Sequence, residues 1–305
     1  MKRLLFLSLL FFSALSIFAN GIDSLKTDED VLQFLKSINE DFRSPKYKGI
    51  ELRNTETLRK ELECGGIAEK WQVNNWEKAD FNQDGRTDLF VILHWYDYGV
   101  YVVMANEDGS FKLLTLSYNI YEKCELAKPI MVDNQQLLLY YEKKHTVISQ
   151  GKTKSEDAVD TLIYKYGGFV ELNRKPINHQ IDSVEFKTDY CLGSCPVFRI
   201  TFDKNGEAIY NASTYNPKQG FFVGTIKKQD FENLLGLINY LDLKKLSNDY
   251  KVSWTDDQTC WLKIKFSDGK IKEIKDYGMK GTFGLRLLYN IFFDLRGNQD
   301  WKLKL

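Results

Sequence analysis

The sequence is poor in the residues that mark most non-globular chains. Its 305 residues include only five prolines and three histidines, and 42 basic residues balance 42 acidic ones. With 43% apolar and 14% aromatic residues, the composition excludes a disordered, collagen-like or low-complexity chain. Because the net charge is zero, no electrostatic field attracts nucleic acid, and we expect no nucleic-acid partner. The length suggests two domains of ordinary size.

Patterns that mark catalytic sites are also missing. The chain has no Gly-x-Ser-x-Gly elbow, no Walker loop, no dinucleotide-binding glycine pattern and no His-Glu-x-x-His. Each histidine has an ordinary setting: His94 in a predicted strand, His145 near a polar turn and His179 beside a predicted domain boundary. Asp256 and Asp257 form a carboxylate pair in a predicted loop, where a solvated turn is the favoured interpretation. The sequence therefore predicts no catalytic residue and favours a non-enzymatic protein.

The first nineteen residues are typical of a secretory signal peptide. A basic head at residues 1–3 precedes an apolar run over residues 4–18, and the small residue Ala19 follows. We predict cleavage after Ala19; the alternative is an uncleaved membrane anchor. No later segment has eighteen consecutive apolar residues, so we expect a periplasmic or secreted protein without a membrane span after cleavage.

The first half of the mature chain, residues 20–175, is predicted to be rich in β-structure. The capping-box pattern from Thr27 to Asp30 and the spacing of apolar residues predict a helix over residues 28–43, and a shorter helix is expected over 56–64. The polar stretch 149–157 is expected to be a linker. Short runs rich in Val, Ile, Leu and Tyr predict strands over residues 89–95, 99–105, 111–118, 130–132, 137–143 and 161–166.

The second half, residues 176–305, is predicted to mix strands and helices. A helix is expected over about residues 228–240, and apolar residues from Leu285 to Phe292 mark a last helix. Strands are predicted over residues 183–188, 197–203, 207–215, 221–226, 261–266 and 271–276. This order predicts an antiparallel sheet covered on one face by two helices. The predicted fold class is α+β, with two domains.

A nine-residue loop, residues 80–88, carries the spacing of a calcium site. Oxygen-bearing side chains stand at its first, third, fifth and ninth positions, and glycine at the sixth, where the chain must turn sharply. Calcium takes six to eight hard oxygen ligands, which such spacing directs toward one ion. The predicted ligands are Asp80, Asn82, Asp84, the backbone carbonyl of Arg86, and Asp88. An EF-hand is excluded, because it carries a bidentate Glu at its twelfth position. The twelfth residue counted from Asp80 is Val91, which lies within a predicted strand.

Residues 79–93 resemble the calcium loops of FG-GAP and VCBS repeats, which join two strands in extracellular propeller proteins. The segment here is Asp-Phe-Asn-Gln-Asp-Gly-Arg-Thr-Asp, against Asp-Phe-Asn-Gly-Asp-Gly-Lys-Thr-Asp in those repeats. A single copy does not imply a propeller. The resemblance implies a structural Ca²⁺ ion, and the alternative is a metal-free turn closed by its Asx side chains.

A second motif consists of two cysteines four residues apart, in Cys191-Leu192-Gly193-Ser194-Cys195-Pro196. In an oxidising compartment these thiols can close a small disulfide. The spacing Cys-x-x-x-Cys-Pro also resembles the copper site of Sco-type chaperones, in which two thiolates and a downstream His bind copper. No His follows Cys195 in this chain, so a structural disulfide is favoured and copper handling or disulfide exchange is the alternative.

The second half as a whole resembles a family of exported bacterial domains of unknown function. The resemblance covers residues 183–301 and rests on Cys-x-Gly-x-Cys-Pro-x-Phe, a following strand, an Asn-Gly hairpin, a Phe-x-x-Leu-Leu helix, Asp256-Asp257-x-Thr259 and an Asp-Gly-Lys hairpin. Because that family has no assigned activity, the resemblance implies a domain boundary and an exported bacterial origin, but no chemistry.

The five cysteines cannot all pair, and two disulfides with one free thiol allow fifteen arrangements. We predict the disulfides Cys191–Cys195 and Cys64–Cys124, with Cys260 free or buried. A zinc site built from the cysteines of the second half and one histidine is less favoured, because the spacing fits no compact zinc knuckle.

These observations predict an exported, non-enzymatic binding or structural protein with a structural calcium ion. Its partner would be an envelope or extracellular protein, or a glycan. Four aromatic residues near the calcium loop either form such a binding surface or belong to the core: Trp95, Tyr96, Tyr98 and Tyr101. The second hypothesis is a periplasmic thiol-redox or copper-handling factor that uses Cys191 and Cys195.

Overall fold

The computed structural model describes residues 21–43, 49–62, 64–95, 97–117, 124–149, 152–243 and 245–304. The predicted signal peptide, residues 1–19, and Tyr96 lie outside the described residues. Within them the chain forms five α-helices and three mostly antiparallel sheets, which confirms the α+β class. No helix in these ranges is long and apolar enough to cross a membrane.

Helix α1 (Asp28–Ile38) begins where the sequence predicts but ends earlier. The Thr27 hydroxyl accepts the N–H of Asp30, whose carboxylate accepts the N–H of Thr27, so the predicted capping box is present. The helix ends because Asn39 is extended and its side chain accepts the first N–H of the 3₁₀ helix η1 (Asp41–Arg43). The single helix predicted over residues 28–43 is therefore two elements.

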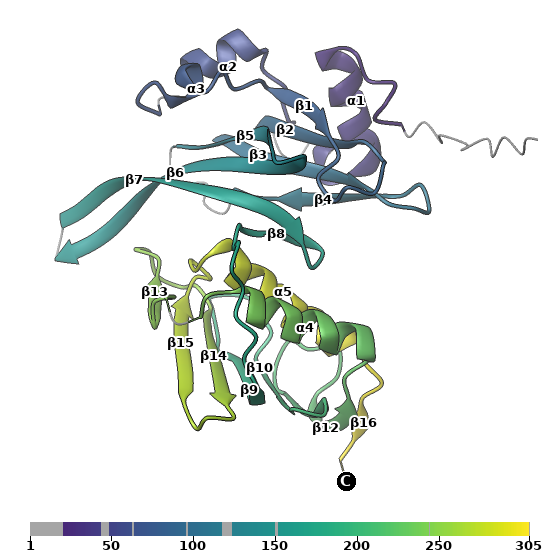
Figure 1. Cartoon of the computed structure of the whole chain (residues 1–305), viewed down its shortest axis with the longest axis vertical. Helices are drawn as coiled ribbons and strands as arrows, with labels where there is room; N and C mark the ends of the chain where they lie inside the picture. The colour runs from purple at the N-terminus through teal and green to yellow at the C-terminus, as the bar shows by residue number, and fades with distance from the viewer. Residues whose placement is uncertain are drawn as a thin grey trace, which may run out of the picture.

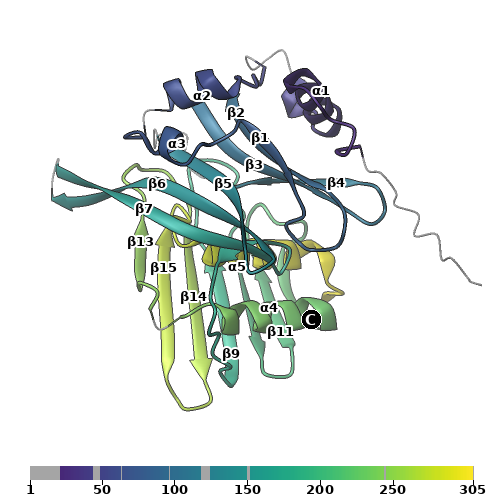
Figure 2. The same cartoon turned by 45° about the horizontal axis from the view of Figure 1, so that its top comes forward.

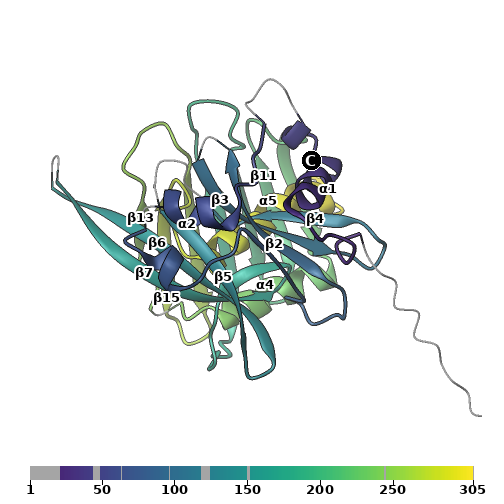
Figure 3. The ribbon, with the colours of Figure 1, turned by 90° about the horizontal axis from the view of Figure 1, so that it is seen from above.

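The first half contains two four-stranded sheets, each with its strands in chain order and joined antiparallel. Helices α1, α2 (Thr55–Glu61) and α3 (Ile67–Lys70) lie on the side away from the second half (Figures 1 and 3). The first sheet is formed by β1 (Trp76–Ala79), β2 (Asp88–Trp95), β3 (Asp97–Ala105) and β4 (Phe111–Thr115). The second is formed by β5 (Glu125–Val132), β6 (Gln135–Ser149), β7 (Lys152–Lys165) and β8 (Gly168–Glu171).

Strand β2 is buried on both faces. Leu89, Val91 and Leu93 pack in one cluster with α1. Phe90 and Ile92 point to the other face and pack in a cluster with α2 and the second sheet. Because side chains alternate across a strand, a continuous apolar run can supply two cores at once.

The prediction of a linker over residues 149–157 is wrong, because residues 152–157 form the first part of β7. That strand pairs with β6, with Asp157 opposite Lys143. Strand β5 pairs with β6 only as far as Glu142, so the outer part of the β6–β7 hairpin is a two-stranded ribbon that projects from the body (Figure 2). A ribbon without a sheet around it need not show apolar alternation, which explains why its sequence resembled a linker.

The second half forms one eight-stranded sheet in the order β13-β15-β14-β9-β10-β11-β12-β16. Neighbouring strands are antiparallel except β13 and β15, which are parallel. Its strands are β9 (Ile181–Thr188), β10 (Phe198–Asp203), β11 (Glu207–Ala212), β12 (Gly220–Thr225), β13 (Asp249–Lys251), β14 (Thr259–Phe266), β15 (Ile271–Tyr277) and β16 (Lys302–Leu303). The sequence missed β13 and β16 because two or three residues are too few to show alternation.

Helices α4 (Lys228–Tyr240) and α5 (Phe283–Asn298) lie between the eight-stranded sheet and the β5–β8 sheet (Figure 1). Side chains from both halves share the buried cluster around these helices, among them Leu137, Ile163 and Val170 of the first half. The core therefore continues across residue 175. The division into domains at residue 175 stays a prediction.

Candidate functional site

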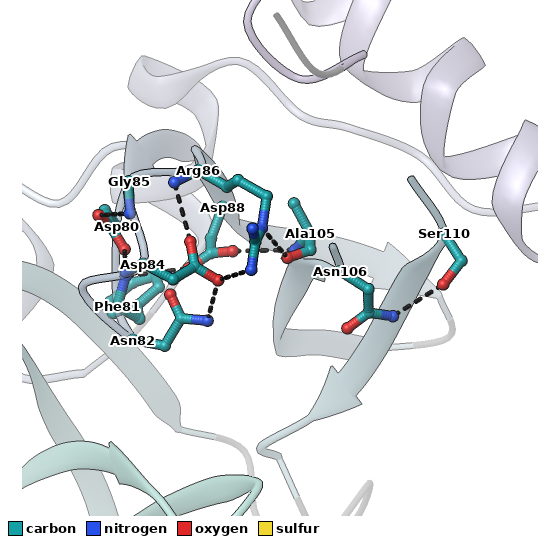
Figure 4. Close-up of polar contacts among 10 residues, drawn as sticks. All are labelled: Asp80, Phe81, Asn82, Asp84, Gly85, Arg86, Asp88, Ala105, Asn106 and Ser110. Carbon is teal, nitrogen blue, oxygen red and sulfur yellow. Dashed lines mark hydrogen bonds and ion pairs between the residues drawn. The ribbon is translucent and has the colours of Figure 1, made fainter. Parts of the chain in front are cut away.

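The predicted calcium loop closes the hairpin between β1 and β2 (Figure 4). Its ends are held together because Ala79 of β1 lies opposite Asp88 of β2 in the antiparallel register. Gly85 has φ of 82°, in the left-handed region that glycine adopts without strain. The hairpin therefore brings the residues of the loop together between two antiparallel strands.

The first and fifth positions of the loop organise its backbone. The carboxylate of Asp80 accepts the N–H of Asp84 at 3.1 Å and the N–H of Gly85 at 2.9 Å. The carboxylate of Asp84 accepts the N–H of Arg86 at 2.8 Å and an amide N–H of Asn82 at 2.6 Å. The bond from Arg86 to Asp84 forms an Asx turn, and the bonds to Asp80 close the backbone of the loop over four and five residues.

Asp88 is fully buried at the start of β2. Its carboxylate accepts the N–H of Phe81 and the N–H of Ala105, each at 2.9 Å. Burial raises the pKa of Asp88 to about 6, the backbone hydrogen bonds lower it, and the charges of Asp80 and Asp84 raise it further. The carboxylates of Asp80 and Asp84 are therefore close enough to repel that of Asp88.

The side chain of Arg86 is the feature that the sequence analysis missed. Its guanidinium donates to the carboxylate of Asp84 and to the carbonyl of Ala105 on β3 (Figure 4). The prediction used only the backbone carbonyl of this residue. A basic side chain at the seventh position of an acidic loop was the available signal, since it partly neutralises the carboxylates beside it.

The donors of the loop fit a hard cation in their chemistry. Oδ1 of Asn82 is buried and has no hydrogen-bond partner in the described structure. No group of three His, Cys, Asp or Glu side chains is arranged to hold a metal in the described ranges. The carboxylates of Asp80, Asp84 and Asp88 are therefore not gathered around one point in this structure, and each accepts backbone N–H groups instead.

The cysteines pair as predicted. Cys64 is bonded to Cys124 and Cys191 to Cys195, with Cα–Cα distances of 5.5 and 5.8 Å. Cys260 is free and buried on β14, and burial raises the pKa of its thiol well above the ordinary value. The first disulfide ties the α2–α3 segment to the start of β5, and two disulfides are typical of a protein from an oxidising compartment.

The loop of the second disulfide lies on the surface. Leu192, between the two cysteines, is 81% exposed, and its N–H donates to the carbonyl of Asp256 at 3.0 Å. The carboxylate of the neighbouring Asp257 accepts the indole N–H of Trp254 at 3.1 Å and the backbone N–H of Gln258 at 2.7 Å. Asp256 and Asp257, the carboxylate pair of the sequence analysis, are thus part of a hydrogen-bonded turn.

The three described aromatic residues predicted beside the calcium loop are half-buried, and Trp95 and Tyr98 lie at the end of β2 away from that loop. Trp95 and Tyr101 make edge contacts with Phe42, at ring distances of 6.4 and 6.0 Å. The hydroxyl of Tyr98 donates to the carboxylate of Glu61. These contacts attach the aromatic side chains to the N-terminal segments.

Comparison with protein families identifies one domain in the chain. Residues 182–296, from β9 into α5, match the model of a domain of unknown function (DUF6438). Neither the curated proteins nor the solved structures include a match. The C-terminal half of the chain therefore contains a DUF6438 domain, in agreement with the resemblance to a domain family of unknown function.

Proposed function

We propose that the chain acts outside the cytoplasm as a non-enzymatic binding or structural protein whose N-terminal half is stabilised by calcium. The ion would be held by oxygens of Asp80, Asn82, Asp84 and Asp88 and by the carbonyl of Arg86. The observation that carries the proposal is the buried, unpartnered Oδ1 of Asn82 within a loop of three carboxylates. The partner would be an envelope or extracellular protein, or a glycan.

The energetics of the loop support a bound cation. A buried acceptor without a hydrogen bond costs about 1–3 kcal/mol, which a ligated cation removes. Arg86 supplies one positive charge against the three carboxylates of the loop, and the raised pKa of Asp88 reflects their repulsion as well as burial. A divalent ion would offset the remaining negative charge, and Arg86 would have to leave Asp84 to admit it.

The two disulfides support an extracytoplasmic location. Disulfides persist in the periplasm and outside the cell, and are rare in the cytoplasm. In that setting a calcium ion and two disulfides would both contribute to the stability of the folded chain.

Thermal unfolding of the purified chain in EDTA, and then with added calcium, tests the calcium site. Calcium at a hundredfold excess over its dissociation constant should stabilise the fold by about 2.7 kcal/mol, seen as a higher melting temperature. Asp84→Ala should abolish this increment. Asp203→Ala is the matched control, because Asp203 closes another Asx turn, between β10 and β11, by accepting two backbone N–H groups. It should lower the melting temperature but keep the calcium increment.

The variant Arg86→Met distinguishes two ways of offsetting the negative charge of the loop: a bound calcium ion and the guanidinium of Arg86. If calcium binds, removing the competing guanidinium should tighten binding, because the backbone carbonyl remains. The absence of a calcium shift in the natural chain, or an equal shift in Asp84→Ala, would overturn the proposal.

The exposure of the Cys191–Cys195 loop supports a second candidate function, thiol-redox or copper handling. Cys191 and Cys195 are half-buried at the ends of this exposed loop, and a disulfide at the surface is open to attack by a thiolate of another protein. Copper(I) added to the reduced chain would then raise the melting temperature, and Cys195→Ser would remove that effect. A disulfide that resists reduction in the folded chain would argue against this candidate.

A further inference from the structure

A cavity of about 660 Å³ lies beside the segment that joins the two halves. Its walls come from β7, from residues 172–178 after β8, and from the end of α4. Sites for small molecules have volumes of about 300–1,000 Å³ and often lie between structural units. The cavity therefore has both the size and the position of a small-molecule site.

The charged groups of the lining are cations. The lining contains Lys165 and Arg174 and no carboxylate. Arg174 forms an ion pair with Asp133 at 3.4 Å. In the described structure the Lys165 ammonium contacts only two rings, with its nitrogen 5.8 Å from the centre of Tyr166 and 5.6 Å from that of Tyr240. Such cation–π contacts are weak at an exposed site, so the ammonium is available to an anion.

The carboxylate of Glu171 does not neutralise this cation. It is half-buried and accepts the N–H groups of Phe283 and Gly284 at 2.6 and 3.0 Å, at the first turn of α5. The positive end of that helix compensates its charge. Lys165 therefore remains the excess charge of the cavity.

The remaining lining offers amide donors and an apolar wall. Oδ1 of Asn178 accepts the amide N–H of Asn239 at 3.1 Å, which leaves the amide nitrogen of Asn178 as a donor. Gln135 supplies another amide. Leu172 and Ile177 line the same cavity, and Ile177 is 46% exposed. A ligand that uses this lining would carry an anionic group on an apolar body.

We propose that the cavity binds a small organic anion. Its carboxylate, sulfonate or phosphate lies at the Lys165 ammonium, and its apolar body lies against Leu172 and Ile177. This site is separate from the calcium loop, so the proposal does not depend on the proposed function.

Two fluorescent probes that differ by one charged group test the proposal. 1-Anilinonaphthalene-8-sulfonate is an apolar anion, and N-phenyl-1-naphthylamine is the same ring system without the sulfonate. Titration of the full chain should show saturable binding of the anion, and binding of the neutral probe about tenfold weaker or more, as expected for loss of a charge-assisted contact. Equal binding of the two probes, or no saturable binding of the anion, would overturn the proposal.

Variants place the site. Lys165→Met should weaken binding of the anionic probe about tenfold and leave the neutral probe unchanged. Lys187→Met is the matched control, because Lys187 also lies over a ring, that of Trp261 at 4.3 Å, outside the lining. Ile177→Glu adds a negative charge to the wall of the cavity and should also weaken binding of the anionic probe. An unchanged affinity in Lys165→Met, or an equal loss in Lys187→Met, would refute the assignment.

Discussion

The buried carboxyl of Glu125 should make the stability of the protein fall as the pH rises. Glu125 is 4% exposed at the start of β5, and its Oε2 has no hydrogen-bond partner in the described structure. Burial raises its pKa from 4.5 to about 7; the hydroxyl of Ser117 lowers it, and the charge of Glu142 raises it further. We propose Glu125→Gln as the perturbation, since glutamine has nearly the same shape and does not ionise.

The magnitude follows from the two pKa values of this residue. Between them the folded chain holds a proton that the unfolded chain has lost, so raising the pH favours the unfolded chain. At about 1.4 kcal/mol for each pH unit, ionisation of Glu125 removes about 3 kcal/mol of unfolding free energy as the pH rises from 4.5 to about 7. Asp88 and Asp276, each with its pKa raised to about 6 by burial, act in the same direction.

Urea unfolding between about pH 4.5 and pH 8 measures this effect as the difference between the natural chain and Glu125→Gln. The variant should gain about 3 kcal/mol relative to the natural chain across that range, because the slopes from Asp88 and Asp276 cancel. Glu142→Gln is the control: it breaks the 3.8 Å ion pair with Lys280 but should keep most of the pH dependence. A difference between Glu125→Gln and the natural chain that stays constant with pH would refute the reasoning.

Three other changes test contacts that contribute to the stability of the folded chain. Replacing both Cys64 and Cys124 by Ser opens a loop with a sequence separation of 60 and should cost about 4 kcal/mol in urea unfolding, on the loop-closure model. Glu171→Ala removes the acceptor of two N–H groups of α5 and should cost about 1–3 kcal/mol, whereas Glu171→Gln, which keeps an acceptor oxygen, should cost less. Gly284→Ala should lower the melting temperature, with a cost of about 1–3 kcal/mol, because the new Cβ would lie 2.1 Å from Leu241 Cδ2; a smaller residue at Leu241 should restore stability. Unchanged stability in any of these variants would show that its contact is dispensable.

Interactions between residues close in the sequence were predictable. The Thr27 capping box and the Cys191–Cys195 disulfide depend on spacings of three and four residues, which the sequence displays directly. The pairing of Cys64 with Cys124 spans a longer distance, but the first half contains no other cysteine. Local spacing therefore identified the Cys191–Cys195 disulfide and the start of α1, whereas the Cys64–Cys124 disulfide followed from the cysteine content of the first half.

The candidate calcium loop was predictable in its backbone but not in its surroundings. The turns made by Asp80 and Asp84 are local, whereas Asp88 and Arg86 also contact Ala105 on the neighbouring strand β3. Spacing alone did not reveal that contact, because it depends on how β2 pairs with β3.

The sequence by itself determined the α+β class, the approximate elements of both halves, the short spacing of Cys191 and Cys195, and the position of the acidic loop. These features follow from periodicity, capping and spacing, which act over a few residues. Tertiary structure alone decided the β6–β7 ribbon, the shared core around α4 and α5, the burial of Glu125 and the cavity beside Lys165. Each of these depends on segments distant in the chain coming together, and that packing sets the burial of a side chain and hence the pKa of a carboxyl.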